Sequence, residues 1–316
     1  ALGGSPGGTV EGEVVRFADL AALEAAPKGS LAGKIAFVDF AMARARDGSG
    51  YGEGSKVRGR GPSAAIRAGA VGYVMRSAGT DLHRNPHTGI TRFDEGLTPI
   101  PSAALSVPDA EQLARLVALG APVRIRVALD CGWDGTATSY NVIGEVTGRD
   151  RKLRDEVVVI GGHLDSWDLG TGAIDDGAGV AIGMGAGRLI AQLPKAQRPP
   201  RTIRVIAFAN EEQGLYGGKA YAEAQKPHVA RHQMVAESDF GAGRIYAFAT
   251  SAPPYAQAAA ARIAEALAPL GIEAVAEGHP ASDVGAIAAE GAAWASLKQD
   301  GTDYFDLHHT PDDTLD

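Results

Sequence analysis

The stretch Val157–Val180, V-V-V-I-G-G-H-L-D-S-W-D-L-G-T-G-A-I-D-D-G-A-G-V, decides the fold of this chain. Its first residues form an apolar run, which predicts a buried strand ending at His163. A glycine-rich loop follows, then the pair Asp175-Asp176, then a helix. Open α/β sheets bind their ligands at the carboxyl ends of such strands. The stretch therefore predicts an α/β sheet with a functional site where this strand ends.

The composition bounds the class of protein. The chain has 316 residues, 45% of them hydrophobic and 22% charged, and a net charge of -8. At ~150 residues per domain, this length predicts about two domains. The acidic balance argues against a nucleic-acid partner, and no apolar run approaches the ~20 residues that span a membrane. Cys131 is the one cysteine, which excludes an intrachain disulfide and a thiolate zinc site.

The first part of the chain predicts an accessory domain. Strand and helix patterns alternate here without a cluster of histidines and acids, so residues 1–135 are expected to form a small α/β domain. Asp47–Gly61 is rich in Gly, Arg and Lys and predicts an exposed loop, followed by a helix over Pro62–Ala70. In the long polar stretch that comes next, His83 and His87 are expected to be solvated loop histidines.

The second part predicts the catalytic domain. Across residues 136–316, apolar strands again alternate with helices, which predicts a mixed, mostly parallel sheet sandwiched by helices. One of these helices is expected over Ser282–Glu290, with Ser282 as its N-cap. The chain begins without Met and without a signal peptide, which favours a mature or trimmed product.

Histidines and acids follow several of these strands or lie in the loops beyond them. They are His163, Asp175, the pair Glu211-Glu212, Asp239 and His309. Zinc binds imidazole nitrogen and carboxylate oxygen, and two zinc ions ~3.5–4 Å apart need a carboxylate between them. We therefore assign His163 and Asp239 to one metal and Glu212 and His309 to the other. Asp175 is assigned to both metals as the bridge.

The remaining acids are assigned supporting roles. Glu211 is left beside the metals and is predicted to be the general base. Metal-bound histidines usually donate their second N–H to a carboxylate, which predicts Asp165 beside His163 and Asp313 beside His309. Asp283 has two interpretations, a contact with the substrate amine or an acid in the first turn of a helix.

Four motifs carry a resemblance to a known family. G-H-L-D-S-W-D-L-G-T-G-A-I-D-D-G-A-G, A-N-E-E-Q-G-L-Y-G, E-S-D and H-H-T-P-D-D-T resemble the co-catalytic zinc exopeptidases of the aminopeptidase/glutamate carboxypeptidase type, above all plasma glutamate carboxypeptidase (carboxypeptidase Q) and its bacterial relatives. V-G-Y-V-M-R-S, N-P-H-T-G-I and I-P-S-A-A-L-S-V-P-D-A-E resemble the inserted protease-associated domain of that family. The resemblance covers nearly the whole chain.

The resemblance implies further features. The family's ligand and base positions fall on the residues assigned above, and Asp175-Asp176 is expected to be joined by a cis peptide. His308 is expected to stabilise the oxyanion, with Tyr304 as a weaker candidate. The resemblance also implies a helical segment before the accessory domain and a helix after the D-D-T stretch, and residues 1–316 are expected to lack both. The resemblance also implies a periplasmic or secreted protein and is compatible with a homodimer.

The expected function is that of a dinuclear zinc exopeptidase. Its substrates would be dipeptides or short peptides, attacked by a metal-bridging water whose proton passes to Glu211. Co²⁺ and Mn²⁺ fit the same ligand types as Zn²⁺. Two alternatives remain open from the sequence. One is a single-zinc glutaminyl cyclase, and the other is a non-catalytic receptor or binding module on the same fold.

Overall fold

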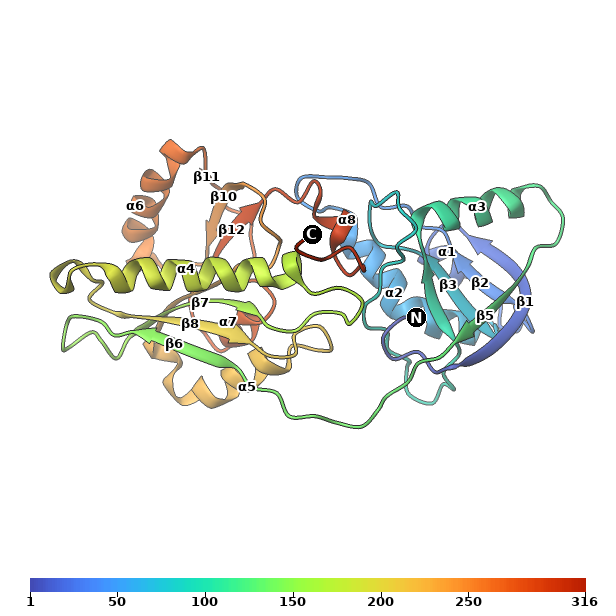
Figure 1. Ribbon diagram of the computed structural model, residues 1–316, viewed down its shortest axis with the longest axis horizontal. Coiled ribbons are helices and arrows are strands. Elements are labelled where there is room, and N and C mark those ends of the chain that lie inside the picture. Colours follow the sequence, from blue (N-terminus) through green and yellow to red (C-terminus); the bar gives the residue numbers. More distant parts are fainter. The chain divides into compact units, whose positions relative to one another are not determined.

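The computed structural model describes residues 1–316, which form two compact units (Figure 1). Unit 1 comprises Ala1–Ala137, Trp167–Gly170 and Phe305–Asp313, and unit 2 comprises Thr138–Ser166, Thr171–Tyr304 and Thr314–Asp316. The first change of unit lies two residues beyond the sequence-based division at residues 135 and 136. Two short segments later in the chain also belong to unit 1, and nothing in their sequence indicates this.

Unit 1 is built on a five-stranded sheet in the order β4-β3-β2-β1-β5. Strands β1 to β4 run parallel, and β5 pairs antiparallel with β1. The strands are β1 (Gly8–Phe17), β2 (Ile35–Val38), β3 (Gly72–Arg76), β4 (Ser102–Leu105) and β5 (Arg124–Leu129). The helices are α1 (Leu20–Glu24), α2 (Tyr51–Arg67) and α3 (Val107–Ala118).

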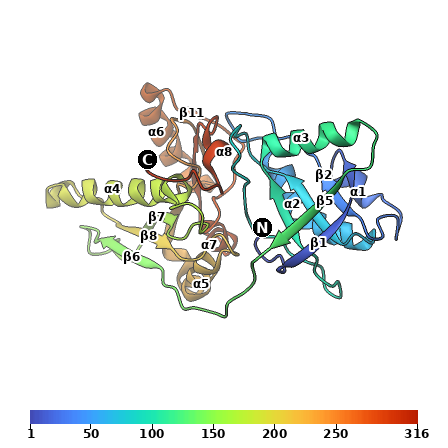
Figure 2. The same ribbon diagram turned by 45° about the vertical axis from the view of Figure 1, so that its right-hand side comes forward.

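The sheet of unit 1 has helices on both faces, as the turned view makes clear (Figure 2). Strand β2 shows why, because all four of its side chains are fully buried. Ala36 and Val38 pack with α1 and α2, whereas Ile35 and Phe37 pack with α3 on the opposite face. Successive side chains of a strand point to opposite faces. A continuous apolar run is therefore the expected pattern for this strand.

The loop predicted over Asp47–Gly61 is largely helical, so that prediction was wrong. Helix α2 begins at Tyr51 and continues to Arg67 with Pro62 inside it. Glycine lowers intrinsic helix propensity, but packing requires it here. A Cβ atom at Gly61 would lie 2.1 Å from the hydroxyl of the buried Tyr73. The glycines let α2 approach the sheet closely, and this tertiary contact outweighs local propensity.

Unit 2 contains two sheets. The larger has the order β6-β8-β7-β9 and the smaller the order β11-β10-β12. The strands are β6 (Val142–Val146), β7 (Val157–His163), β8 (Thr202–Phe208), β9 (His232–Glu237), β10 (Ile245–Thr250), β11 (Glu273–Ala274) and β12 (Ala295–Gln299). The α-helices are α4 (Ala178–Gln192), α5 (Tyr216–Gln225), α6 (Gln257–Leu267) and α7 (Val284–Ala289). Of α8 (Tyr304–Leu307), only Tyr304 belongs to unit 2. Short helical turns are η1 (Ala173–Gly177), η2 (Lys195–Gln197), η3 (Lys226–Arg231), η4 (Pro254–Ala256) and η5 (Ala268–Leu270).

Helices cover both faces of the larger sheet (Figure 1). Strand β7 is parallel to β8 and β9, and only the edge strand β6 is antiparallel. Ile206 packs with α5 and α7, whereas its neighbour Val205 faces α4, where a Cβ atom at Gly187 would lie 2.8 Å away. The predicted mixed, mostly parallel α/β architecture is therefore confirmed.

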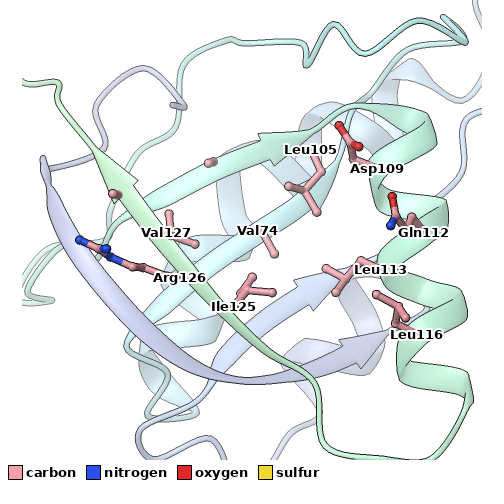
Figure 3. A pocket seen from close by; sticks show the side chains of 11 residues that line it. Val74, Leu105, Asp109, Gln112, Leu113, Leu116, Ile125, Arg126 and Val127 are labelled. Atoms are coloured by element: carbon pink, nitrogen blue, oxygen red, sulfur yellow. The ribbon is translucent and has the colours of Figure 1, made fainter.

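Unit 1 contains a cavity that none of the predicted site residues line. It is a cavity of about 430 Å³ between α3 and the sheet, lined mainly by apolar side chains such as Leu105, Leu113 and Ile125 (Figure 3). No helix of either unit is both long enough and apolar enough to cross a membrane.

Candidate metal centre

Strand β7 delivers His163 to the buried interior of unit 2. Its side chain is 1% exposed, and its backbone N–H donates to Oδ2 of Asp176 at 3.0 Å. The Nδ1 atom lies 2.9 Å from the carbonyl oxygen of Asp165, which can only accept, so Nδ1 carries a hydrogen. In the neutral ring this leaves a lone pair on Nε2, the form in which histidine binds metals.

The Nε2 atom of His163 faces two carboxylates. It lies 3.3 Å from Oδ1 of Asp175 and 3.5 Å from Oδ1 of Asp239. The peptide between Asp175 and Asp176 is cis, as the resemblance implied. Asp176 anchors this turn by accepting from the backbone amide of Gly179, where a Cβ atom would lie 1.8 Å from the carbonyl oxygen of Ser238. Glycine is therefore required at the start of α4.

The pair Glu211-Glu212 follows β8 and approaches the same histidine. Asn210 turns the chain with a φ of 57°, a left-handed conformation that asparagine tolerates better than most residues. Donor atoms of His163, Glu211 and Glu212 lie within 4.8 Å of one another, as do those of His163, Asp175 and Asp239. Unit 2 thus brings together four of the predicted ligands and the predicted base.

The structure assigns Asp165 a different role from the predicted one. Its backbone carbonyl contacts Nδ1 of His163, whereas its Oδ1 atom lies 3.7 Å away from that nitrogen. The carboxylate instead accepts the amide hydrogens of Glu211 at 2.8 Å and Glu212 at 3.1 Å. One residue therefore holds the histidine through its main chain and the glutamate pair through its side chain.

We expect Asp165→Asn to weaken metal binding and slow turnover. An asparagine has one acceptor oxygen where two amides need two, and its NH₂ group would face an N–H donor. Loss of such a supporting contact typically costs ~10–100-fold in metal affinity. Zinc titration of the metal-stripped protein measures this effect. The neighbouring exposed Asp168→Asn serves as control, and equal affinities in the two variants would remove this role from Asp165.

Burial and mutual repulsion shape the protonation of this cluster. Burial, reinforced by the charge of Asp239, raises the pKa of Glu211 to about 8, and the same two causes raise the pKa of Asp176. Burial alone would lower the pKa of His163, but its contacts with Asp175 and Asp239 raise it well above the ordinary value. Concentrated carboxylates with one imidazole between them are a donor set that suits divalent cations. The residues present in unit 2 therefore fit zinc.

These raised pKa values predict that the metal-free protein loses stability as the pH rises. A carboxyl group with a raised folded-state pKa keeps a proton that the unfolded chain releases, so its contribution is present below the ordinary pKa of about 4.5 and lost as the pH passes about 8. We expect the thermal midpoint of chelator-treated protein to be several degrees lower at pH 9 than at pH 5.5. In Glu211→Gln the difference should shrink, and a flat profile in the unmodified chain would contradict the assignment.

The two adjacent histidines His308 and His309 belong to unit 1. Both are buried, and their rings stack with centroids 3.7 Å apart. The Nδ1 atom of His309 lies 3.1 Å from the carbonyl oxygen of Thr88. Asp313 is also buried in unit 1, and its predicted contact with His309 stays a prediction.

The prediction that His87 is a solvated histidine was wrong. Its side chain is 2% exposed, and its Nε2 atom lies 2.9 Å from Nη1 of the buried Arg58. Burial and the Arg58 charge both lower its pKa. The same guanidinium contacts the Tyr51 hydroxyl at 3.0 Å. His87 therefore belongs to the polar interior of unit 1, which its position in a polar stretch of sequence concealed.

Asp283 is the N-cap residue of α7 rather than an acid in its first turn, and its predicted contact with the substrate amine stays a prediction. The residue is 1% exposed and accepts from the amide of Gly218 in α5. Ser282, predicted as the N-cap, donates instead to Oδ2 of Asp239 at 3.0 Å. Sequence reasoning assigned no role to Glu237, which accepts the amides of Asp283 and Val284 where α7 begins. The E-S-D motif, which begins at Glu237 and ends at Asp239, was the one sequence feature that could have indicated a role for Glu237. Tyr304 is buried against Phe240, and its role stays a prediction.

The sequence model of peptidase family M28 matches residues 141–316, more than half of the chain. The chain belongs to peptidase family M28. The matched region contains the whole metal-ligand cluster of unit 2, so the family membership and the site concern the same part of the M28 chain.

Related proteins extend the likeness to the rest of this M28 chain. Carboxypeptidase Q of Xenopus laevis is 34% identical over 317 residues, which cover 99% of this chain and 65% of the relative. Carboxypeptidase Q of Homo sapiens is 33% identical over 265 residues, or 84% of this chain and 55% of the relative. The M28 chain therefore spans about half to two thirds of the length of these curated relatives.

Solved structures show the same fold. The peptidase M28 precursor from Shewanella amazonensis is 46% identical, with a TM-score of 0.94 over 99% of this chain and 70% of that chain. A zinc aminopeptidase from Bacillus subtilis is 20% identical, with a TM-score of 0.64 over 99% of this chain and 71% of that chain. At that identity the second likeness concerns the fold alone.

Proposed function

We propose that the chain is a zinc-dependent exopeptidase with two metal ions, acting on dipeptides or short peptides. The observation that carries the proposal is the convergence of His163, Asp175, Asp239, Glu211 and Glu212 in the interior of unit 2. Membership of a peptidase family supports the same reaction class. So does the likeness to carboxypeptidase Q.

The proposed ligand set follows from donor chemistry. His163 and Asp239 would hold one ion, Glu212 the other, and Asp175 would bridge them. From the sequence, His309 would be a further ligand of the second metal, and Asp313 would accept the second N–H of its ring. His308 remains the proposed oxyanion stabiliser and Tyr304 the weaker candidate. Zn²⁺ is the ion we favour, and Co²⁺ and Mn²⁺ suit the same donors.

The chain's own residues would move the proton. Zinc ions held by this donor set would polarise the scissile carbonyl and acidify the attacking water. Glu211 accepts a proton from that water and returns it to the nitrogen of the leaving amine. The carboxylate of Asp165 accepts the backbone amides of Glu211 and Glu212. It would therefore fix the position of the proposed base relative to the proposed ligand beside it.

The proposal also extends beyond the catalytic centre. Residues 1–135 would form a protease-associated accessory domain, with residues 136–316 as the catalytic domain. The protein would act in the periplasm or after secretion and would be compatible with a homodimer. These points rest on the resemblance of the sequence motifs.

A dipeptide panel tests the function. We expect zinc-loaded protein to release free amino acids from some dipeptides, chelator treatment to stop the release, and added zinc to restore it. Hydrolysis that survives complete metal removal would contradict the proposal. Cyclisation of N-terminal glutamine with one zinc per chain would favour the cyclase. Zinc binding without turnover of any short peptide would favour the binding module.

A further inference from the structure

Unit 1 contains a second group of potential metal ligands, formed by Asp81, His83 and Asp312. The Nδ1 atom of His83 lies 2.9 Å from Oδ1 of Asp81 and 3.9 Å from Oδ2 of Asp312. Donor atoms of all three residues lie within 4.8 Å of one another. The proposed peptidase function uses Asp81, His83 and Asp312 in no step.

The buried Asp81 carboxylate is the observation that points to a cation. Asp81 is 7% exposed, and it meets His83 through Oδ1. The same oxygen accepts the backbone amide of His83 at 2.8 Å. Its Oδ2 atom is sealed from solvent and has no hydrogen-bond donor. A buried carboxylate oxygen is normally satisfied by donors or by a cation, because its desolvation is costly.

The basic residue nearest in sequence does not neutralise these acids. Arg84 lies next to His83 in the chain, but its Nη1 atom is 3.2 Å from Oδ1 of Asp109. Asn85 donates to Oδ2 of Asp312 at 2.6 Å, which orients that carboxylate without adding charge. Two carboxylates therefore lie beside one histidine, whose side chain is 80% exposed.

The spacing suits coordination of a single ion. Donor atoms bound at ~2.0–2.2 Å to one zinc ion lie roughly 3–3.6 Å apart. The distances from Nδ1 of His83 to the two carboxylates, 2.9 and 3.9 Å, bracket that range. One imidazole with two carboxylates favours a transition-metal ion over Mg²⁺ or Ca²⁺, which prefer oxygen alone. The exposure of His83 and Asp312 leaves room for water as further ligands.

We propose that Asp81, His83 and Asp312 form a divalent transition-metal site in unit 1, separate from the candidate peptidase centre. The site would join the loop after β3 to the segment Phe305–Asp313. These parts of unit 1 already contact each other, because Thr80 donates to Asp306 at 2.7 Å. An ion would add a stronger tie between them, so binding should stabilise the folded state by mass action.

Zinc titration of the complete chain after metal removal tests the site. We expect the unmodified protein to bind one more equivalent of Zn²⁺ than His83→Ala. Because His83 is 80% exposed, the alanine variant should fold normally. His279→Ala removes an exposed histidine of unit 2 and should bind as many ions as the unmodified chain. Asp312→Asn, which keeps the side-chain volume, should weaken the additional ion at least tenfold.

The same titration, followed by thermal unfolding, gives a second measure. Zinc should raise the thermal midpoint less in His83→Ala than in His279→Ala. Equal zinc counts in the unmodified chain and His83→Ala would overturn the proposal and leave only an Asp81–His83 hydrogen bond. Equal losses in both histidine variants would overturn it as well. Dipeptide hydrolysis is measured separately, so the zinc counts can be interpreted even if the proposed peptidase function fails.

Discussion

Glu211→Gln should retain its metal ions and lose most of its turnover. Glutamine keeps the shape of the side chain but cannot accept the proton of the attacking water. A positioned general base typically contributes ~10²–10⁴-fold to a rate, so kcat should fall within that range while zinc content stays constant. Steady-state hydrolysis of a dipeptide and elemental analysis of the same sample measure both quantities.

The control for this substitution is Glu223→Gln. Glu223 lies on the exposed side of α5, so its replacement removes the same charge without touching the cluster. Full turnover should remain in that variant. If Glu211→Gln also kept full turnover, another group would be the base. If it lost zinc as well, Glu211 would be a ligand rather than a proton acceptor.

Asp175→Ala should lose zinc as well as activity. Two cations held close together repel, and a shared carboxylate is what offsets that repulsion. Asp175 is 4% exposed, and its Oδ1 atom lies 3.3 Å from Nε2 of His163. We expect dialysed variant protein to contain at least one zinc ion fewer per chain than the unmodified protein.

Folding has to be separated from metal binding in this case. Asp175→Asn keeps the volume of the side chain and should show the same zinc deficit in smaller measure, and circular dichroism reports whether each variant is folded. A folded Asp175→Ala protein with the full zinc content would remove Asp175 from the ligand set.

The sequence was most informative where local pattern and chemistry coincide. Apolar runs ending at His163 and just before Glu211 gave the strand ends correctly, because fully buried strands and their polar termini contrast sharply. It was least informative where distant contacts decide. The glycines of α2 suggested a loop, but Tyr73, brought against the helix by the fold, makes glycine at Gly61 necessary. Such a contact leaves no local trace.

The same distinction applies to the candidate site. Residue type and order were enough to select His163, Asp175, Asp239, Glu211 and Glu212, which the structure places together in unit 2. The sequence could not show which atom of each residue makes each contact. Asp165 supports His163 through its carbonyl and the glutamates through its carboxylate. That division depends on how two loops meet, and the hydrogen-bonding capacity of aspartate allows either arrangement.

Anomalous scattering at the zinc edge from crystals of zinc-loaded protein tests the central claim most directly. The account predicts two peaks ~3.5–4 Å apart in unit 2, one contacting His163 and Asp239, the other contacting Glu212, with Asp175 touching both. A map with no peak among these residues would contradict the two-metal centre on which the proposed function rests.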